Sequence, residues 1–237
     1  MIAQIPNEML LEFFHFFPLK SLISARGVNQ KWRRLVPLAH LIPARRALLD
    51  LYDTVIKSPV FLSSRDVVLS NTLPFDREAY LDSLLREHCA IPDEFYFWLM
   101  EWPSAAAFGW THPILNAEHN RKKEPWRPFG MNCLSVESAS IRECEWMSDF
   151  ALHVNSFPAA APRYKKDWVA LKAILVWAEE SHFAMLTWLI IDDRPHCSAW
   201  HGKLCVGEGE WDANPIASGW VDWLTRKRIV AKGALED

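Results

Sequence analysis

Four residues that commonly bind zinc lie close together near the C-terminus of the chain: His196, Cys197, His201 and Cys205. Imidazole and thiolate groups are good zinc ligands. However, this segment contains no Cys-x-x-Cys pair, and neighbouring side chains on a strand point to opposite faces of a sheet. We therefore interpret these residues as ordinary parts of a β-hairpin, and the sequence predicts neither a metal site nor a cofactor.

Two other groups of residues could support catalysis. Asp192 and Asp193 could form an acid–base pair, but adjacent side chains at the end of a strand usually point apart. Cys144 lies between two glutamates and precedes His153, yet a Cys–His nucleophile also needs an orienting group and a lowered thiol pKa. No GxSxG, Walker A, GxGxxG or HExxH motif occurs. We predict no catalytic residues, and an enzyme is the third of three hypotheses for the function.

The composition is that of a globular protein. The chain has 237 residues, of which 50% are hydrophobic and 23% are charged, and its formal net charge is −3. The charge is divided unevenly, because residues 1–60 carry a net charge of +4 and the remainder carries −7. Basic segments lie near tryptophans at 121–123, 165–166 and 226–228, but the acidic surroundings argue against nucleic acid as a partner.

The sequence also limits where the protein acts. The most apolar stretch near the C-terminus, residues 182–191, is about half as long as a membrane-spanning helix, so we expect no membrane partner. The first residues lack the basic region of a secretory signal. The five cysteines include no Cys-x-x-Cys pair, which favours a reducing compartment. We therefore expect a cytoplasmic or nuclear location, or both.

The elements that position these residues are predicted from apolar spacing and from prolines. Helices are predicted between residues 7 and 37, interrupted at Pro18 and ended at Pro37, and again over residues 43–57, 76–88, 93–101, 165–180 and 217–230. Residues 58–74 are predicted to be a mixed connecting segment, and residues 102–162 to be rich in loops. Strands are predicted within residues 183–206. Because helices come first and strands later, the fold class is α+β with a mainly antiparallel sheet.

Residues 5–35 resemble an F-box. The resemblance is carried by Ile5-Pro6, by Glu8 with two following leucines, by the segment from Pro18 to Leu22, and by Val28 with Trp32. It implies a three-helix F-box over residues 1–42 that binds the Skp-type adaptor of a cullin–RING ubiquitin ligase. The residues that the resemblance implies for adaptor binding are Ile5, Pro6, Leu10, Leu11, Phe14, Leu19, Leu22, Val28 and Trp32.

Residues 75–237 resemble a SUKH (Smi/Knr-like) domain, and residues 43–74 would then form a linker helix and connecting segment. The resemblance is carried by residues 91–99, by the strand that ends at Asp192, by Gly202 with Val206, and by residues 215–224. The Asn-Gly pair of that family is replaced by residues 101–103, Glu-Trp-Pro. Because SUKH-like domains are mostly protein-binding modules, the resemblance implies recognition of a protein.

These features favour a non-catalytic substrate-recognition subunit of an SCF-type ubiquitin ligase. The alternative is a regulatory protein-binding scaffold of the SUKH superfamily that acts outside the ligase. Trp102, Trp110 and Trp126 lie in the proline-rich region, where exposed aromatic side chains can anchor a protein partner. We therefore predict these three tryptophans as partner-binding residues.

Overall fold

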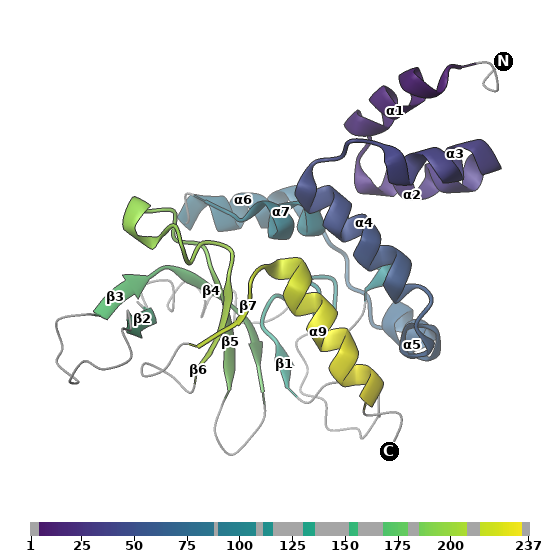
Figure 1. Cartoon of the computed structure of the whole chain (residues 1–237). Coiled ribbons are helices and arrows are strands. Elements are labelled where there is room, and N and C mark those ends of the chain that lie inside the picture. Colours follow the sequence, from purple (N-terminus) through teal and green to yellow (C-terminus); the bar gives the residue numbers. More distant parts are fainter. Residues whose placement is uncertain are drawn as a thin grey trace.

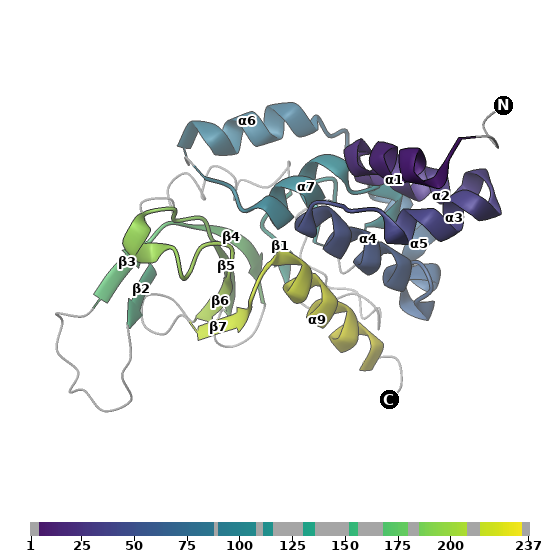
Figure 2. The same cartoon turned by 45° about the horizontal axis from the view of Figure 1, so that its top comes forward.

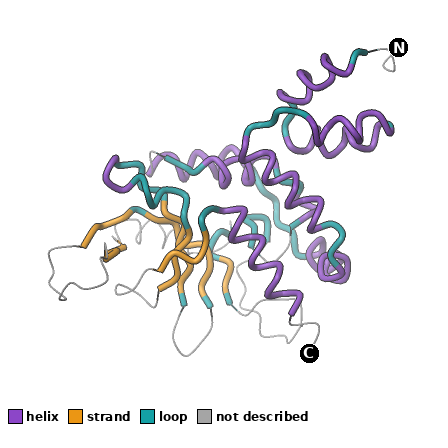
Figure 3. The backbone as a smooth tube through the Cα atoms, viewed as in Figure 1, coloured by secondary structure: helices purple, strands orange, loops and turns teal. Residues whose placement is uncertain are grey.

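A computed structural model describes residues 5–87, 90–107, 111–115, 130–135, 152–155, 168–179, 185–207 and 214–233 of the chain. Across these residues helices come first and antiparallel strands follow (Figures 1 and 3). The fold is therefore α+β, as the order of apolar patterns predicts. The C-terminal helix α9 (Trp220–Gly233) follows the last strand and also agrees with the predicted helix over residues 217–230.

Three short helices form the N-terminal part: α1 (Asn7–Phe16), α2 (Leu19–Val28) and α3 (Gln30–Leu35), followed by the 3-10 turn η2 (Val36–Leu38). Pro18 separates α1 from α2, because proline has no backbone N–H and cannot continue a helix. Asn29 separates α2 from α3. Its backbone is extended, and its side-chain oxygen accepts a hydrogen bond from the Trp32 N–H at 2.8 Å, which caps α3.

Four further helices lead towards the sheet: α4 (Pro43–Val55), α5 (Pro59–Ser70), α6 (Arg77–Glu87) and α7 (Asp93–Glu101), followed by the 3-10 turn η3 (Ser104–Ala106). The helices predicted over residues 43–57, 76–88 and 93–101 are present. The prediction of a mixed segment over 58–74 is wrong, because α5 occupies most of it. Pro59 is the first residue of α5, where its missing N–H costs nothing, and it therefore begins a helix here.

The main sheet has five antiparallel strands in the order β1-β4-β5-β6-β7. These are β1 (Met131–Asn132), β4 (Ala173–Ala178), β5 (Leu186–Ile190), β6 (Leu204–Gly207) and β7 (Asn214–Ala217); the 3-10 turn η5 (Pro195–Cys197) lies between β5 and β6. Two further strands, β2 (Leu152–Asn155) and β3 (Trp168–Leu171), pair with each other. Gly130 precedes β1 with a φ of +137°, and a Cβ there would lie 2.4 Å from the Ala178 carbonyl oxygen, so only glycine fits.

Strands β3 and β4 contradict the prediction of a helix over residues 165–180. The apolar residues of this segment fit helical spacing because nearly every position of β4 is apolar. Residues 173–177 are all buried, so β4 has packed side chains on both of its faces. A continuous apolar run of this kind is compatible with a helix or with a strand that is covered on both sides.

Alternation along the strands divides the buried side chains between two clusters. The main cluster takes Ile174 and Val176 of β4 together with Leu189 of β5, and it extends through the helices. The second cluster takes residues on the opposite face of the sheet, including Leu175 and Trp188. Both faces of the sheet are therefore covered by buried side chains, and α7 and α9 lie on the face of the main cluster.

Helix α4 lies between the N-terminal helices and the rest of the molecule (Figure 2). It contacts α2, α7 and α9. The main cluster runs without interruption from Leu10 and Leu22 through Leu48 to Trp220 and Leu224. The three N-terminal helices therefore share one continuous hydrophobic core with α4, α7 and α9.

Candidate functional site

Helix α1 presents apolar side chains on two faces. Leu10 and Phe14 point inward and are buried in the main cluster. Met9, Phe13 and Phe16 are 51%, 49% and 74% exposed. Their spacing places them on one side of the helix, where they form an outward stripe, which we call the α1 stripe. Apolar side chains gathered on a surface in this way are typical of an interface.

A groove with a volume of about 320 Å³ lies beside these helices. Its lining includes the apolar side chains of Phe17, Val28 and Trp32, together with Lys20 and two serines. Val28 is 53% exposed, and Leu38 of η2, which is 70% exposed, adds a further apolar side chain to the surface of the N-terminal part. The pKa of the exposed Lys20 is lowered by partial desolvation and by the nearby charge of Arg77. The lining of the groove is therefore mainly apolar and contains one cation.

The nine residues implied for adaptor binding divide into two groups. Four of them are buried in the chain's own core: Leu10, Phe14, Leu19 and Leu22. Five remain wholly or partly accessible: Ile5, Pro6, Leu11, Val28 and Trp32. The buried four position the helices, whereas only the accessible five can touch another protein without rearrangement of this core.

The α1 stripe and Leu38 were not among the predicted docking residues. A signal for the stripe is nevertheless present in the sequence. Leu10 and Phe14 are four residues apart and define one apolar face of the helix. Further apolar residues lie off that face, at Met9, Phe13 and Phe16. A helix that is apolar on more than one side needs either a core around it or a partner outside it.

Polar contacts fix the outer ends of the N-terminal helices. Lys31 donates from its ammonium group to the Ile5 carbonyl oxygen at 2.7 Å, which ties the segment before α1 to α3. Arg33 donates to the Arg26 carbonyl oxygen near the end of α2 at 3.2 Å. These contacts hold Pro6 and the start of α1 beside α3, so the exposed residues form a surface of defined shape.

Of the three tryptophans predicted as partner anchors, one lies in the described part of the chain. Trp102 is fully buried, and its indole N–H donates to the Ala106 carbonyl oxygen at 3.1 Å. Its prediction as an exposed anchor is wrong, because it directly follows α7, whose last turn packs into the core. Trp110 and Trp126 lie outside the described residues, and their role stays a prediction.

Two of the four candidate zinc ligands near the C-terminus lie in an apolar environment. Cys197 and Cys205 are buried in the second cluster among apolar side chains. Burial raises the pKa of the Cys205 thiol to about 11, so this group is protonated at neutral pH. Over the part of the chain that the structure describes, no group of three or more His, Cys, Asp or Glu side chains could hold a metal ion.

Asp192 and Asp193 do point apart. Asp192 is buried and binds Arg194 through both carboxylate oxygens, and it also accepts the Lys172 backbone N–H at 3.0 Å. The Arg194 hydrogen bonds hold the pKa of Asp192 well below its usual range. Asp193 is exposed. The contact between Asp192 and Arg194 therefore fixes a turn. The other candidate catalytic residues, Glu143, Cys144 and Glu145, lie outside the described residues.

Of the three basic segments near tryptophans, the one at residues 226–228 lies in a described helix. Arg226 pairs with Asp222 one turn earlier in α9, at 2.9 Å. Lys227 lies over the ring of Trp177, 4.8 Å from its centroid, and 3.6 Å from a carboxylate oxygen of Glu179. Both charges are thus partnered within the chain.

Comparison with known proteins identifies the N-terminal part. Residues 2–40 match the family model described as the F-box domain. This domain comprises α1, α2, α3 and η2, the same elements that carry the α1 stripe and the groove. No curated protein and no solved structure matches the chain. The F-box domain indicates a substrate-adaptor role in a ubiquitin ligase, with a Skp-type adaptor and a cullin–RING ligase as partners.

F-box proteins are generally non-catalytic adaptors. The matched segment ends at residue 40, so the resemblance of residues 75–237 to a SUKH domain has no support from the family match. In the described part of the chain, no helix is both long enough and apolar enough to cross a bilayer.

Proposed function

We propose that this protein is a non-catalytic substrate-recognition subunit of an SCF-type ubiquitin ligase. The F-box domain binds the Skp-type adaptor, and residues 75–237 bind the protein substrate. The observation that carries the proposal is the α1 stripe, because three large apolar side chains lie in water on the segment that matches the F-box family. Burying them against an adaptor would contribute about 25 cal/mol per Å² of apolar area, against which stands the cost of association.

The proposal that residues 75–237 bind the substrate rests on the packing of α7 and α9 beside the sheet. Residues 91–99, which carry the SUKH resemblance, include all but the last two residues of α7, and residues 220–224 open α9. These two helices pack on each other beside an antiparallel sheet. The arrangement supports the proposal that this region is a protein-binding module, and such a module would act where its ligase acts, in the cytoplasm or nucleus.

Co-purification with a Skp-type adaptor tests the docking. We expect the wild-type chain to form a stoichiometric complex, and we expect Phe13→Ser with Phe16→Ser to lose it, because the substitutions remove apolar contact area without entering the core. The melting temperature of the isolated variant should stay near that of the wild type.

Leu62→Ser is the matched control, since Leu62 is an equally exposed apolar residue on α5, outside the F-box domain. This variant should retain the adaptor. A wild-type chain that purifies without the adaptor would overturn the proposal and would favour the alternative, a regulatory scaffold that acts outside the ligase.

A further inference from the structure

Helix α7 carries a carboxylate at each end that caps a helix distant in the sequence. Near its start, Glu94 accepts a hydrogen bond from the Val221 N–H in the first turn of α9, at 2.9 Å. At its end, Glu101 accepts one from the Leu19 N–H, the first residue of α2, at 2.7 Å. The N-terminus of a helix has unpaired N–H groups and a partial positive charge, so a carboxylate there is favourable.

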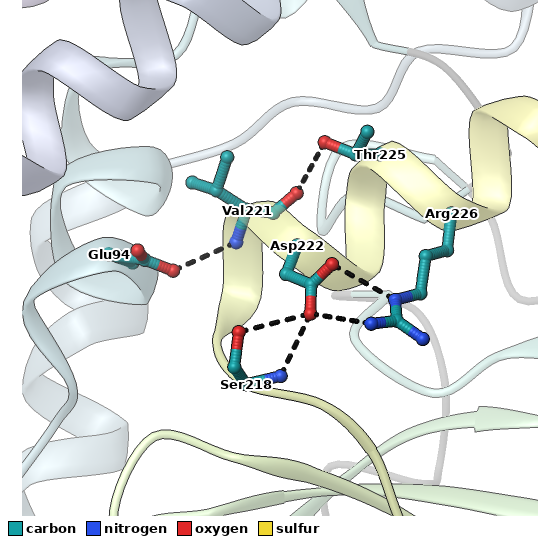
Figure 4. A network of polar contacts seen from close by, with 6 residues as sticks. All are labelled: Glu94, Ser218, Val221, Asp222, Thr225 and Arg226. Atoms are coloured by element: carbon teal, nitrogen blue, oxygen red, sulfur yellow. Dashed lines mark hydrogen bonds and ion pairs between the residues drawn. The ribbon is translucent and has the colours of Figure 1, made fainter.

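The Glu94 end belongs to a larger polar network (Figure 4). Asp222 accepts from the backbone and the hydroxyl of Ser218, at 2.9 and 3.0 Å, and it pairs with Arg226. Gly219 leaves room for the carboxylate, because a Cβ at this position would lie 2.6 Å from Glu94 Oε2. The start of α9 is therefore held to α7 at a fixed position.

The Glu101 end joins three helices at one point. Arg45 of α4 forms two hydrogen bonds with the Glu101 carboxylate, from Nη2 to Oε1 at 2.7 Å and from Nε to Oε2 at 2.9 Å. The side chains are only 10% and 13% exposed. A two-pronged contact of this kind fixes the orientation of both groups, and Glu101 Oε2 is thereby directed at the N-terminus of α2.

Further contacts hold the helices of this junction, one beside Glu101 and one about two turns further along α2 and α4. Arg77 of α6 donates to the carbonyl oxygens of Leu99 and Trp102, so it closes the end of α7 next to Glu101. Arg26 of α2 forms an ion pair with Asp53 of α4. The guanidinium of Arg45 also lies over the ring of Phe97, 4.7 Å from its centroid. The junction thus combines directional polar contacts with the shared apolar core.

We infer that Glu101 is a positioning residue that fixes the orientation of the F-box domain relative to α7, α9 and the sheet. Apolar packing alone is non-directional, so helices that share a core can still slide or rotate by small amounts. The carboxylate sets the position of α2 because its oxygen must meet one particular N–H group. The importance of this orientation for ubiquitin transfer rests on the proposed function, whereas the orientation itself does not.

Two double variants test the inference. Arg45→Met with Glu101→Gln removes both charges and keeps an acceptor for the Leu19 N–H. Arg45→Met with Glu101→Leu removes the charges and the acceptor. Neither variant leaves a buried charge without a partner, which is the usual reason that such substitutions prevent folding. The two variants differ mainly in the presence of one hydrogen-bond acceptor.

The measurement is the distribution of distances between labels at Gln30 on α3 and Ala199 after η5, both of which are exposed. Non-natural amino acids should carry the labels, since the chain has five cysteines. We expect a narrow distribution for the wild type, an intermediate width for the glutamine variant, and at least a twofold greater width for the leucine variant. Glu78→Ala, an exposed acid on α6, should match the wild type.

Equal widths in the wild type and in a folded leucine variant would overturn the inference. A leucine variant that does not fold would also overturn it, because Glu101 would then be a general determinant of stability. Adaptor co-purification of the same variants should be unchanged, since the α1 stripe is intact. If the wild-type chain itself does not bind the adaptor, that result would count against the proposed function and not against the positioning role of Glu101.

Discussion

At the scale of single residues, His112 makes stability depend on pH. Its ring is completely buried, 4.8 Å from the ring of Trp98, and its Nδ1 accepts the Ile114 N–H at 3.2 Å. Burial, together with the charges of Arg77 and Lys20, lowers the pKa of His112 from 6.5 to about 3. The neutral ring is therefore built into the fold, and protonation opposes folding.

Because the pKa of His112 is lowered in the folded state, the free energy of unfolding falls as the pH falls. The contribution of His112 is complete above pH 6.5, and it is lost as the pH falls from there towards 3. Between pH 7 and pH 5 we expect a loss of about 2 kcal/mol in the free energy of unfolding. Urea unfolding at pH 7, 6 and 5 measures this loss of stability.

Two variants identify the source of that loss. His112→Asn, which keeps an acceptor for Ile114, should be less stable at pH 7 but should lose much less stability between pH 7 and pH 5. His40→Asn, at an exposed histidine, is the matched control. A slope that His112→Asn does not alter would contradict this account.

At the scale of elements, the short helix α3 depends on its cap. It has six residues, too few to be stable without help. Asn29→Ala removes the acceptor for the Trp32 N–H, and we expect it to lower the free energy of unfolding by about 1 kcal/mol. Chemical denaturation measures this loss, and an unchanged midpoint would show that tertiary contacts alone hold α3.

The element order could be predicted from the sequence where prolines and polar caps mark the ends. Pro18, Asp76 and Pro92 each directly precede an observed helix, and the predicted limits of α7 agree with the structure, whereas the break at Asn29 between α2 and α3 was not predicted. Prediction failed for α5 and β4 for different reasons. Of the turn signals near α5, Ser58-Pro59 marks its start and Ser63-Ser64 lies inside the helix. The apolar run of β4 has no periodicity that distinguishes a strand from a helix.

The candidate site was predictable only in part. The F-box resemblance located the segment correctly, because its motif lies in local sequence. It could not separate inward from outward side chains, since that depends on which helices pack together. Phe14 and Phe13 are neighbours of the same type, yet one is buried in the core and the other is half exposed. Trp102 is a similar case, because its burial requires α7 and η3.

At the scale of the whole molecule, the continuous core predicts that the C-terminal part depends on the F-box domain. Leu19 and Leu22 pack in the same cluster as α4 and α9. Removal of residues 1–41 would expose apolar area on α4 and would leave the Glu101 carboxylate without the Leu19 N–H. We expect the fragment 42–237 to melt at a lower temperature than the full chain and to aggregate.

Differential scanning fluorimetry and light scattering on the two proteins check this expectation. The full chain carrying Phe13→Ser with Phe16→Ser is the control, since it alters the F-box surface and leaves the shared core in place. A fragment as stable and as soluble as the full chain would show that the core divides at residue 42.

The three-helix junction at Glu101 also bears on protein engineering. A motif that is recognisable in sequence is often exchanged between proteins as an independent cassette. Here a foreign F-box would have to present a backbone N–H to Glu101 and an arginine to Asp53 at the same time as it matched the apolar surface of α4. A chimera of this chain would therefore need the donor helix α2 to be redesigned residue by residue, even if both parent domains were well folded.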